Sequence, residues 1–285
     1  MQISVLGFAG GMDTRARTTC FLIDDDTLID AGTGLFDLPL SVQQGIDHVF
    51  ITHAHLDHIA ALPLLADAGV RQRMAQGRGP IRVYALPEVL EAMHAHLFNQ
   101  QIWPDFTVLP TPQQPAIQLV PLQTGERLEW AAGRWLEVLP ARHTVPAVGY
   151  AVSHGGVAWA FTGDTGRNPA LWQRLNAMHA EGHGVRWLVT ETTFPNTDQS
   201  FADRSGHLTV SALAEELEAL DAGEVELFLS HIKPGDMGAI LRELEPLRTV
   251  AGQQRCRLHL LQQGQTFRFN GVPASGVEND IVLNI

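Results

Sequence analysis

The sequence has only two cysteines, Cys20 and Cys256, and it has no long uninterrupted apolar run. Each cysteine lies in an apolar, strand-like context, so we expect buried free thiols rather than a disulfide framework. Without a run of roughly 18 apolar residues, no membrane-spanning helix is predicted. The segment Met1–Leu6 has neither a basic start nor a cleavage site, so we expect no signal peptide and a cytoplasmic protein.

Positive charge is also scarce, with 19 basic against 31 acidic residues and a net charge of −12. This charge repels polyanions at long range, so binding of nucleic acid through the general surface is disfavoured. A small anionic substrate can still be held by the local charge of a metal. The apolar share of 45% is typical of a globular protein, and the 285 residues contain no linker-like stretch, which predicts a single domain, 1–285.

Strand-like and helix-like patterns alternate along the chain. The first part resembles an antiparallel meander, with short β-rich runs at Ile3–Leu6, Cys20–Ile23 and Thr27–Ile29. Later segments have helical apolar spacing between strands such as Trp187–Thr190 and Val225–Leu229; the helices are expected at Pro87–Phe98, Pro169–Ala180, Val210–Leu220 and Met237–Leu247. The proline-rich segment Pro110–Pro121 is expected to be a surface loop. The pattern predicts a layered α/β fold.

Four potential metal ligands follow one apolar strand within six residues: His53, His55, Asp57 and His58. Residues two apart on an extended segment point to the same side, so His53 and His55 can share one metal. Asp57 and His58 turn toward a neighbouring metal as a helix starts. The alternative is a solvated or helix-capping cluster, but imidazoles this dense would repel on protonation unless metals or carboxylates compensated.

Three further candidate ligands, His143, Asp164 and His231, each come just after an apolar strand. Taken alone, either histidine could equally be a surface residue, and Asp164 could belong to a plain Gly-Asp turn. The full pattern, His-x-His-x-Asp-His followed by separate His, Asp and His, resembles the metallo-β-lactamase superfamily over nearly the whole chain. The resemblance implies a four-layer αββα sandwich, with one metal on His53, His55 and His143, a second on Asp57, His58 and His231, and Asp164 between them.

The resemblance also indicates the reaction class. His55 occupies a position at which relatives of di-iron oxygen reductases generally have a carboxylate, and a histidine there favours hydrolysis. Two metals a few ångströms apart can hold a bridging hydroxide and bind phosphoryl oxygens, which suits a phosphodiester. An alkoxide leaving group also needs a proton donor, and Glu191 with His207 is the candidate pair.

Spacing alone would make Glu191 an exposed strand end and His207 a residue near a helix cap. In phosphodiesterases of this superfamily, a Glu in a similar Glu-x-Thr-Phe stretch orients a His in a Gly-His-x-Thr stretch. The resemblance therefore gives a catalytic set of Asp57, Glu191 and His207.

The sequence further resembles the class II cyclic-nucleotide phosphodiesterases. The matching segments are 53–59, 96–106, Glu191–Asn196 with 206–209, and Ser230–Pro234; one departure is Ala61, where Gly or Ser is usual. The implied reaction opens a 3′,5′-cyclic phosphate of cAMP or cGMP by attack of the bridging hydroxide, with the 3′ oxygen leaving, to give a 5′-nucleotide. Zinc is the default metal, and Mn or Fe would also tolerate these ligands.

The stretch from Asn99 to Phe106 is the candidate substrate-binding segment. Trp103 and Phe106 could form an apolar wall against a base, and Asn99 could bond to sugar or base edges. The alternative is an aromatic loop that anchors the core.

Three rival functions remain. Segment 142–150 and the Glu191/His207 pair also resemble ribonuclease Z, but that family holds tRNA with a long basic arm, and this chain offers only the short stretch Arg71–Arg82. A non-catalytic nucleotide-binding protein would be expected to have lost ligands or the proton donor. Glyoxalase-like or lactonase-like hydrolysis gives no reason for Glu191 and His207. Homodimerisation is possible as the commonest assembly.

Overall fold

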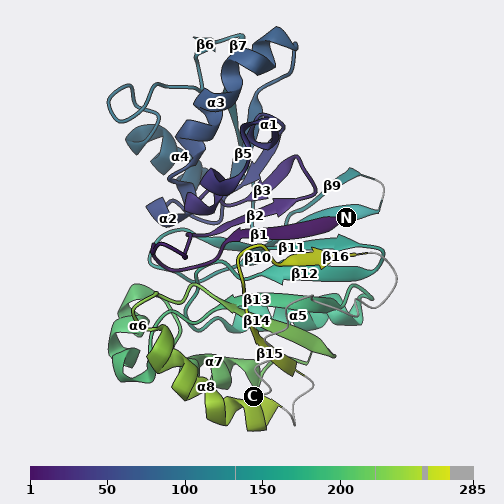
Figure 1. Ribbon diagram of the computed structural model, residues 1–285. Helices are drawn as coiled ribbons and strands as arrows, with labels where there is room; N and C mark the ends of the chain where they lie inside the picture. The colour runs from purple at the N-terminus through teal and green to yellow at the C-terminus, as the bar shows by residue number, and fades with distance from the viewer. Residues whose placement is uncertain (132, 222, 252–255, 270–285) are drawn as a thin grey trace.

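The computed structural model of the chain describes residues 1–131, 133–221, 223–251 and 256–269. Within these residues, two seven-stranded sheets pack face to face, and helices cover the outer face of each sheet (Figure 1). This arrangement confirms the predicted four-layer αββα sandwich. The antiparallel start β1–β2–β3 is confirmed as well.

The first sheet contains the N-terminal strands together with β16. In spatial order its strands are β16 (Thr266–Arg268), β1 (Gln2–Gly7), β2 (Cys20–Ile23), β3 (Thr27–Ile29), β4 (His48–Phe50), β5 (Ile81–Ala85) and β8 (Ile117–Pro121). The helical segments in this part of the chain are η1 (Thr33–Asp37), α1 (Leu40–Gln43), α2 (Leu56–Ile59), α3 (Leu62–Ala75) and α4 (Pro87–His96).

The second sheet follows in the sequence. Its strands in spatial order are β15 (Cys256–Leu260), β14 (Val225–Ser230), β13 (Val185–Glu191), β12 (Val157–Phe161), β11 (Val148–His154), β10 (Arg134–Pro140) and β9 (Arg127–Ala131). The helical segments are α5 (Pro169–Ala180), η2 (Asn196–Asp198), α6 (Gln199–Ser205), α7 (Val210–Leu217) and α8 (Met237–Ala251). Every helix expected from apolar spacing is present; α5 has the predicted bounds, and α4, α7 and α8 differ from the prediction only at their C-terminal ends.

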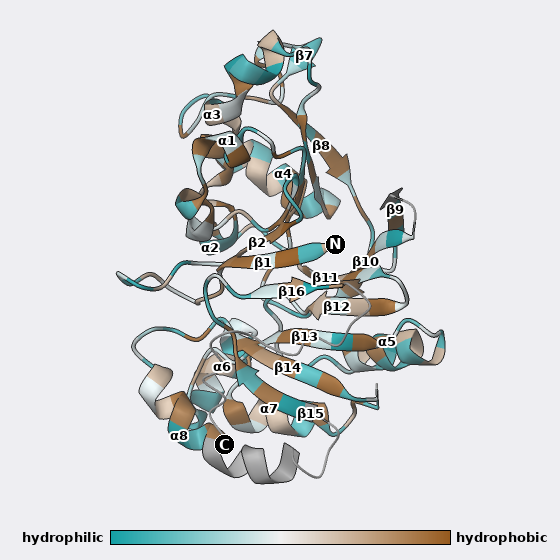
Figure 2. Ribbon diagram, turned by 45° about the vertical axis from the view of Figure 1, so that its right-hand side comes forward, coloured by the Kyte–Doolittle hydropathy of each residue, from teal (hydrophilic) through white to brown (hydrophobic). Residues whose placement is uncertain are grey.

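Three hydrophobic clusters separate the four layers. The middle cluster lies between the sheets and includes Phe21, whose ring centroid is 5.2 Å from that of Trp159 and 4.9 Å from that of Phe161. The outer clusters join each sheet to its helices, for example through Leu65 and Trp172. Figure 2 shows hydrophobic residues along the strands of both sheets. Cys20 is a buried free thiol, as expected.

The prediction of a loop over Pro110–Pro121 was wrong. The segment forms a short hairpin of β6 (Pro110–Thr111) and β7 (Gln114–Pro115), and it then enters the first sheet as β8, parallel to β5. Proline lacks a backbone donor, but an edge strand needs donors on one side only. β8 is at the edge of its sheet, and Pro121 is its last residue.

The loops at one edge of the sandwich bring the candidate site together. Strands β12, β13 and β14 are parallel, so Asp164, Glu191 and His231 leave the second sheet at the same edge. Helix α2, which carries Asp57 and His58, and helix α6, which precedes His207, both lie at the left side of Figure 1. No helix in the described part of the chain is long and apolar enough to cross a membrane.

Candidate metal centre

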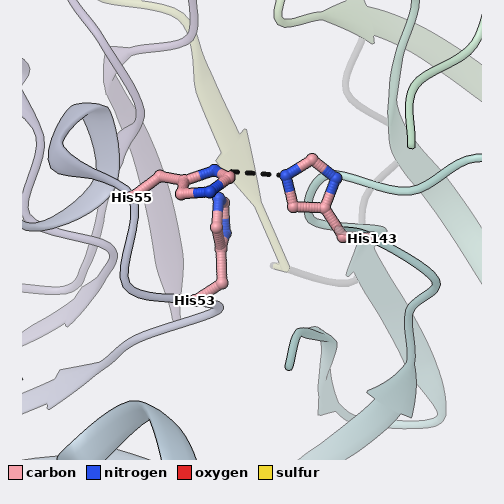
Figure 3. Close-up of side chains that lie close together, drawn as sticks. All are labelled: His53, His55 and His143. Atoms are coloured by element: carbon pink, nitrogen blue, oxygen red, sulfur yellow. Dashed lines mark hydrogen bonds between the residues drawn. The ribbon is translucent and has the colours of Figure 1, made fainter. Parts of the chain in front are cut away.

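Three histidines from two different layers form the first group of candidate ligands. His53 and His55 lie between β4 and α2, and His143 follows β10. Their rings converge in Figure 3, where Nε2 of His143 lies 3.2 Å from Nδ1 of His55. Nδ1 of His143 donates to the carbonyl oxygen of Gly206 at 2.9 Å, so Nε2 has a lone pair that faces the site.

Four more side chains form the second group: Asp57, His58, Asp164 and His231, with ligand atoms within 4.8 Å of one another. Nε2 of His231 is 3.2 Å from Asp57 Oδ2 and 3.1 Å from Asp164 Oδ2. Asp164 Oδ2 is also 3.7 Å from Nε2 of His53 in the first group. The structure therefore brings all seven predicted ligands together, with the Asp164 carboxylate between the two groups.

The atoms that face this site fit a divalent metal. Among the described residues, His53 Nε2, His58 Nε2 and Asp164 Oδ1 are buried without a hydrogen-bond partner. An unpaired buried polar atom is costly, and a metal ion would satisfy all three. Imidazole and carboxylate donors in this mixture suit zinc, manganese or iron.

Electrostatics favour the ligating protonation states of most of these groups. Burial is the main cause that lowers the pKa of His53, His55 and His143, so each ring tends to be neutral and can donate a lone pair to a metal. Burial raises the pKa of Asp57 and Asp164, but nearby histidines, His231 foremost, outweigh it and hold both below their usual value. Both carboxylates are therefore ionised at neutral pH.

Asp30 supports the second group from behind, and the sequence analysis did not identify it. Its buried carboxylate accepts from Nδ1 of His58 at 2.7 Å and from the backbone N–H of Thr52 at 2.8 Å. This bond turns Nε2 of His58 toward the site, as carboxylates behind metal-binding histidines do. Burial lowers the pKa of His58, but the negative charges of Asp164 and Asp30 outweigh the effect of burial and raise this pKa well above its usual value. The available signal was an acidic residue directly after the apolar strand Thr27–Ile29.

Two backbone features position ligands from the second sheet. Gly163, just before Asp164, has φ of +64°, and a Cβ there would lie 2.6 Å from the carbonyl oxygen of Val148. His231 has φ of 58°, an uncommon value for a residue with a side chain. Its N–H donates to the carbonyl oxygen of Phe8 at 2.6 Å, so the loop after β1 holds this strained residue in place.

Glu191 and His207 form the predicted pair beside the ligand groups. The fully buried Glu191 carboxylate accepts from His207 Nδ1 at 2.9 Å, and its two oxygens also accept from Thr165 N, Thr193 Oγ1 and Leu208 N. The ring of His207 lies 4.8 Å from that of His143 and 5.2 Å from that of His231. Burial lowers the pKa of His207, but the charge of Glu191 outweighs it and raises the pKa above its usual value.

Thr193 is a second residue that the sequence analysis did not single out. Its hydroxyl lies 2.6 Å from Glu191 Oε2 and 3.0 Å from His231 Nδ1. It therefore links the proton-donor pair to a ligand of the second group. Its place within the Glu-x-Thr-Phe stretch was the only available signal.

The three residues predicted to bind substrate lie around the segment after α4. Phe106 is 7% exposed and belongs to the cluster between the first sheet and its helices, and Trp103 packs against this cluster. The Asn99 amide donates to the carbonyl oxygen of Ala95, and its oxygen accepts from the backbone N–H groups of residues 101 and 102. These contacts are those of a core-anchoring loop, and contact with a nucleotide base stays a prediction.

Comparisons with known proteins identify the family and the fold. The family profile described as "Beta-lactamase superfamily domain" matches residues 26–232. The chain is 24% identical to a probable 3′,5′-cyclic-nucleotide phosphodiesterase of Yersinia pestis, over 94% of the chain and 89% of that protein. It is also 24% identical to a ribonuclease Z of Parasynechococcus marenigrum, over 82% and 87% respectively. The crystal structure of unliganded yeast PDE1 has the same fold, with a TM-score of 0.76 at 18% identity, covering 93% of this chain and 98% of that one.

Proposed function

The chain belongs to the metallo-β-lactamase superfamily, and from that premise we propose that it is a metal-dependent phosphodiesterase that converts 3′,5′-cyclic nucleotides into 5′-nucleotides. The observation that carries the phosphodiesterase assignment is the Glu191–His207 pair beside the two ligand groups. Hydrolysis of an alkyl phosphodiester needs a proton for the leaving oxygen. A histidine that is held in a fixed position by a buried carboxylate can supply that proton.

The proposal includes two divalent metals, one held by His53, His55 and His143 and one by Asp57, His58 and His231, with Asp164 shared. Such ions supply charge stabilisation of a phosphoryl group and activation of a water molecule. Zinc is the first choice for this donor set. The three buried ligand atoms without a hydrogen-bond partner support this assignment, and two of them, His58 Nε2 and Asp164 Oδ1, lie 3.4 Å apart.

The protein side chains have separate tasks in the proposed reaction. Asp30 and Gly206 fix the rings of His58 and His143 through hydrogen bonds to Nδ1, so that each Nε2 is left to bind a metal. Glu191 fixes the ring of His207 in the same way. Because the charge of Glu191 raises the pKa of His207, the ring holds its second proton more readily than a free imidazole does, and the proton on Nε2 passes to the 3′ oxygen as the P–O bond breaks.

Cyclic nucleotides are the proposed substrates because two relatives, one from Yersinia pestis and one from Aliivibrio fischeri, are named as 3′,5′-cyclic-nucleotide phosphodiesterases. The chain matches both proteins over most of their length. Small size also fits the acidic chain, which repels long polyanions. Asn99, Trp103 and Phe106 remain the proposed base-binding segment. We propose a cytoplasmic location and leave a homodimer as the possible assembly.

Cleavage of precursor tRNA is the second candidate, because ribonuclease Z relatives match much of the chain. In the basic stretch Arg71–Arg82, however, two of the four arginines, Arg73 and Arg78, are committed to structure. Arg73 is buried and donates to Asp47 and to the carbonyl oxygens of residues 46 and 79. Arg78 donates to the carbonyl oxygens of residues 44 and 45 and pairs with Asp47. These arginines are therefore poorly placed to bind RNA.

The decisive experiment is chromatographic product analysis after metal-loaded protein is incubated with 3′,5′-cyclic AMP or 3′,5′-cyclic GMP. We expect the 5′-nucleotide in at least one reaction, and none with chelator-treated protein. A 3′-nucleotide product would contradict the proposed leaving group. If neither compound is hydrolysed while precursor tRNA is cut, the ribonuclease Z assignment replaces this one.

A further inference from the structure

A pocket opens beside the candidate metal centre. It has a volume of about 370 Å³ and is continuous with the site, because two site histidines are part of its wall. Its walls come from the loop after β10, the turn after β12 and helix α6. We call it the arginine pocket; residues that line it include Arg142, His143, Arg167, Asp203, Arg204 and His207.

The arginine pocket is basic in a chain that is strongly acidic. Arg167 is already neutralised, because it pairs with Glu215 at 2.5 Å. Arg204 donates to the uncharged Ser200 hydroxyl at 2.7 Å. The side chain of Arg142 is exposed and has no hydrogen bond or ion pair within residues 1–131, 133–221, 223–251 and 256–269. The wall also carries one acidic residue, Asp203. Two arginines, Arg142 and Arg204, are still able to bind an anion in the pocket.

The position of the pocket identifies the part of a substrate that would reach it. Glu191 occupies Nδ1 of His207, so the proton for the leaving group comes from Nε2. The atoms attached to the leaving oxygen must therefore lie next to His207. The arginine pocket begins at His207, so it is on the leaving-group side of the reaction.

We propose that the arginine pocket binds a second phosphate on the leaving group, and that linear 5′-phosphorylated dinucleotides are substrates of this site. This inference rests on the proposed phosphodiesterase function. In the reaction, water adds to the internal phosphorus, the bond from phosphorus to the 3′ oxygen breaks, and His207 gives that oxygen its proton. The products are two 5′-mononucleotides, and the 5′-phosphate of the departing one lies between Arg142 and Arg204.

A cyclic mononucleotide cannot use this subsite, because its single phosphate is the one under attack. A dinucleotide without a 5′-phosphate cannot use it either. The 5′-phosphate should therefore increase kcat/KM by about tenfold, the effect expected of one charge-assisted hydrogen bond from an arginine. Since Arg142 is exposed, added salt should weaken this preference.

The test compares three substrates: pApA, ApA and 3′,5′-cyclic AMP. In the wild-type protein, kcat/KM for pApA should exceed that for ApA about tenfold. Arg142→Ala should lower the ratio of kcat/KM for pApA to that for cyclic AMP about tenfold, and Arg142→Lys should restore part of it. The matched control is Arg82→Ala, which removes an exposed arginine from β5 in the other sheet and should leave the ratio unchanged.

The outcomes separate the two proposals. If cyclic AMP is hydrolysed but Arg142→Ala leaves the ratio unchanged, the subsite is wrong and the cyclic-nucleotide activity stands. If cyclic AMP is not hydrolysed but pApA is, and Arg142→Ala lowers the ratio of kcat/KM for pApA to that for ApA about tenfold, the subsite stands and the cyclic-nucleotide activity is wrong. Hydrolysis of none of the three overturns both. Should Arg142→Ala fail to fold, Arg204→Ala gives the same comparison with the same expected direction.

Discussion

His207 is fixed through Nδ1 by Glu191, so in the proposed reaction it can transfer a proton only from Nε2. Replacing it with alanine should lower kcat by roughly 10²–10⁴-fold, the usual contribution of a general acid. Metal content should not change, because the seven candidate ligands remain. Inductively coupled plasma mass spectrometry and steady-state kinetics measure the two quantities, with His96→Ala, an exposed histidine at the end of α4, as the control.

A nitrophenyl phosphodiester makes this experiment more specific. Its leaving group departs without a proton, so His207→Ala should affect this compound much less than a cyclic nucleotide. Equal losses with both compounds would show that the variant acts through the metal site instead. Normal turnover of the cyclic nucleotide would remove His207 from the proposed mechanism.

The hydrogen bond from His58 to Asp30 should contribute to metal affinity, although Asp30 is not itself a candidate ligand. Asp30→Asn keeps the shape but removes the charge that holds His58, so metal affinity should fall about 10–100-fold. Asp164→Ala, which removes a carboxylate shared by both groups, should deplete the metal outright. Metal retained against increasing chelator measures both, and the exposed Asp67→Ala serves as control. Wild-type retention by Asp30→Asn would contradict the supporting role.

Residue patterns predicted the ligands because metal chemistry restricts residue type and spacing at the same time. His53, His55, Asp57 and His58 are close together in sequence, and imidazoles this dense repel one another on protonation unless a metal or a carboxylate compensates. Asp30 contacts the site through its hydrogen bond to His58, and Thr193 through its hydrogen bond to His231. In both cases the partner is far away in the sequence. Only packing brings such partners together, so single polar residues in these positions carry almost no local signal.

At the level of elements, a charged network ties β10 to β9 and α5. The Glu137 carboxylate is 2% exposed, and it pairs with Arg127 from β9 at 2.7 Å and with Arg174 from α5. Burial raises the pKa of Glu137, but hydrogen bonds from Arg174 and Arg127 outweigh it and hold the pKa below its usual value of 4.5. The ionised form therefore stabilises the folded protein above that pH, and this stabilisation is lost as the pH falls through the folded-state pKa.

Glu137→Gln should consequently reduce the free energy of unfolding by about 1.5–3 kcal/mol at pH 7, the range for a hydrogen bond to a charged group. The difference from wild type should shrink at pH 4. Urea denaturation with chelator present in all samples measures this without a contribution from metal release. Glu129→Gln, an exposed carboxylate on β9, is the control, and a difference independent of pH would contradict the electrostatic origin of the effect.

Segment 110–121 shows where element prediction fails. Proline suggests a loop because it cannot donate to a ladder, and that argument is correct for an interior strand. Whether a strand lies at an edge depends on the order of the whole sheet, which nearby residues do not determine. The ends of α4 and α8 differ from the prediction for a related reason, since helix ends are set by what they pack against.

At the level of the whole molecule, the two sheets share both a core and the candidate metal ligands. His53, His55 and His58 come from the first sheet, while His143, Asp164 and His231 come from the second. Metal removal should therefore lower the Tm of the entire molecule, because bound metal favours the state in which the sheets are in contact. At a metal concentration 100 times the Kd, the stabilisation is about 2.7 kcal/mol.

Differential scanning calorimetry with and without chelator tests this expectation. We propose that 1–285 is one domain, so each sample should give one transition, and that transition should move to lower temperature without metal. A separate transition for either half would contradict the single domain. An unchanged Tm after complete metal loss, verified by mass spectrometry, would contradict the link between the sheets.

The pairing of β1 with β16 has a consequence for synthesis on the ribosome. β1 is translated before β16, and one edge of β1 pairs with Thr266–Arg268, which lie far further along the chain. At elongation rates of about 5–20 residues per second, this edge stays open for on the order of tens of seconds. The loop after β1 also holds His231, so the nascent chain cannot complete its active centre early. Catalytic competence should therefore appear only after His231 has been translated, and until β16 is made the unpaired edge of β1 must avoid other chains.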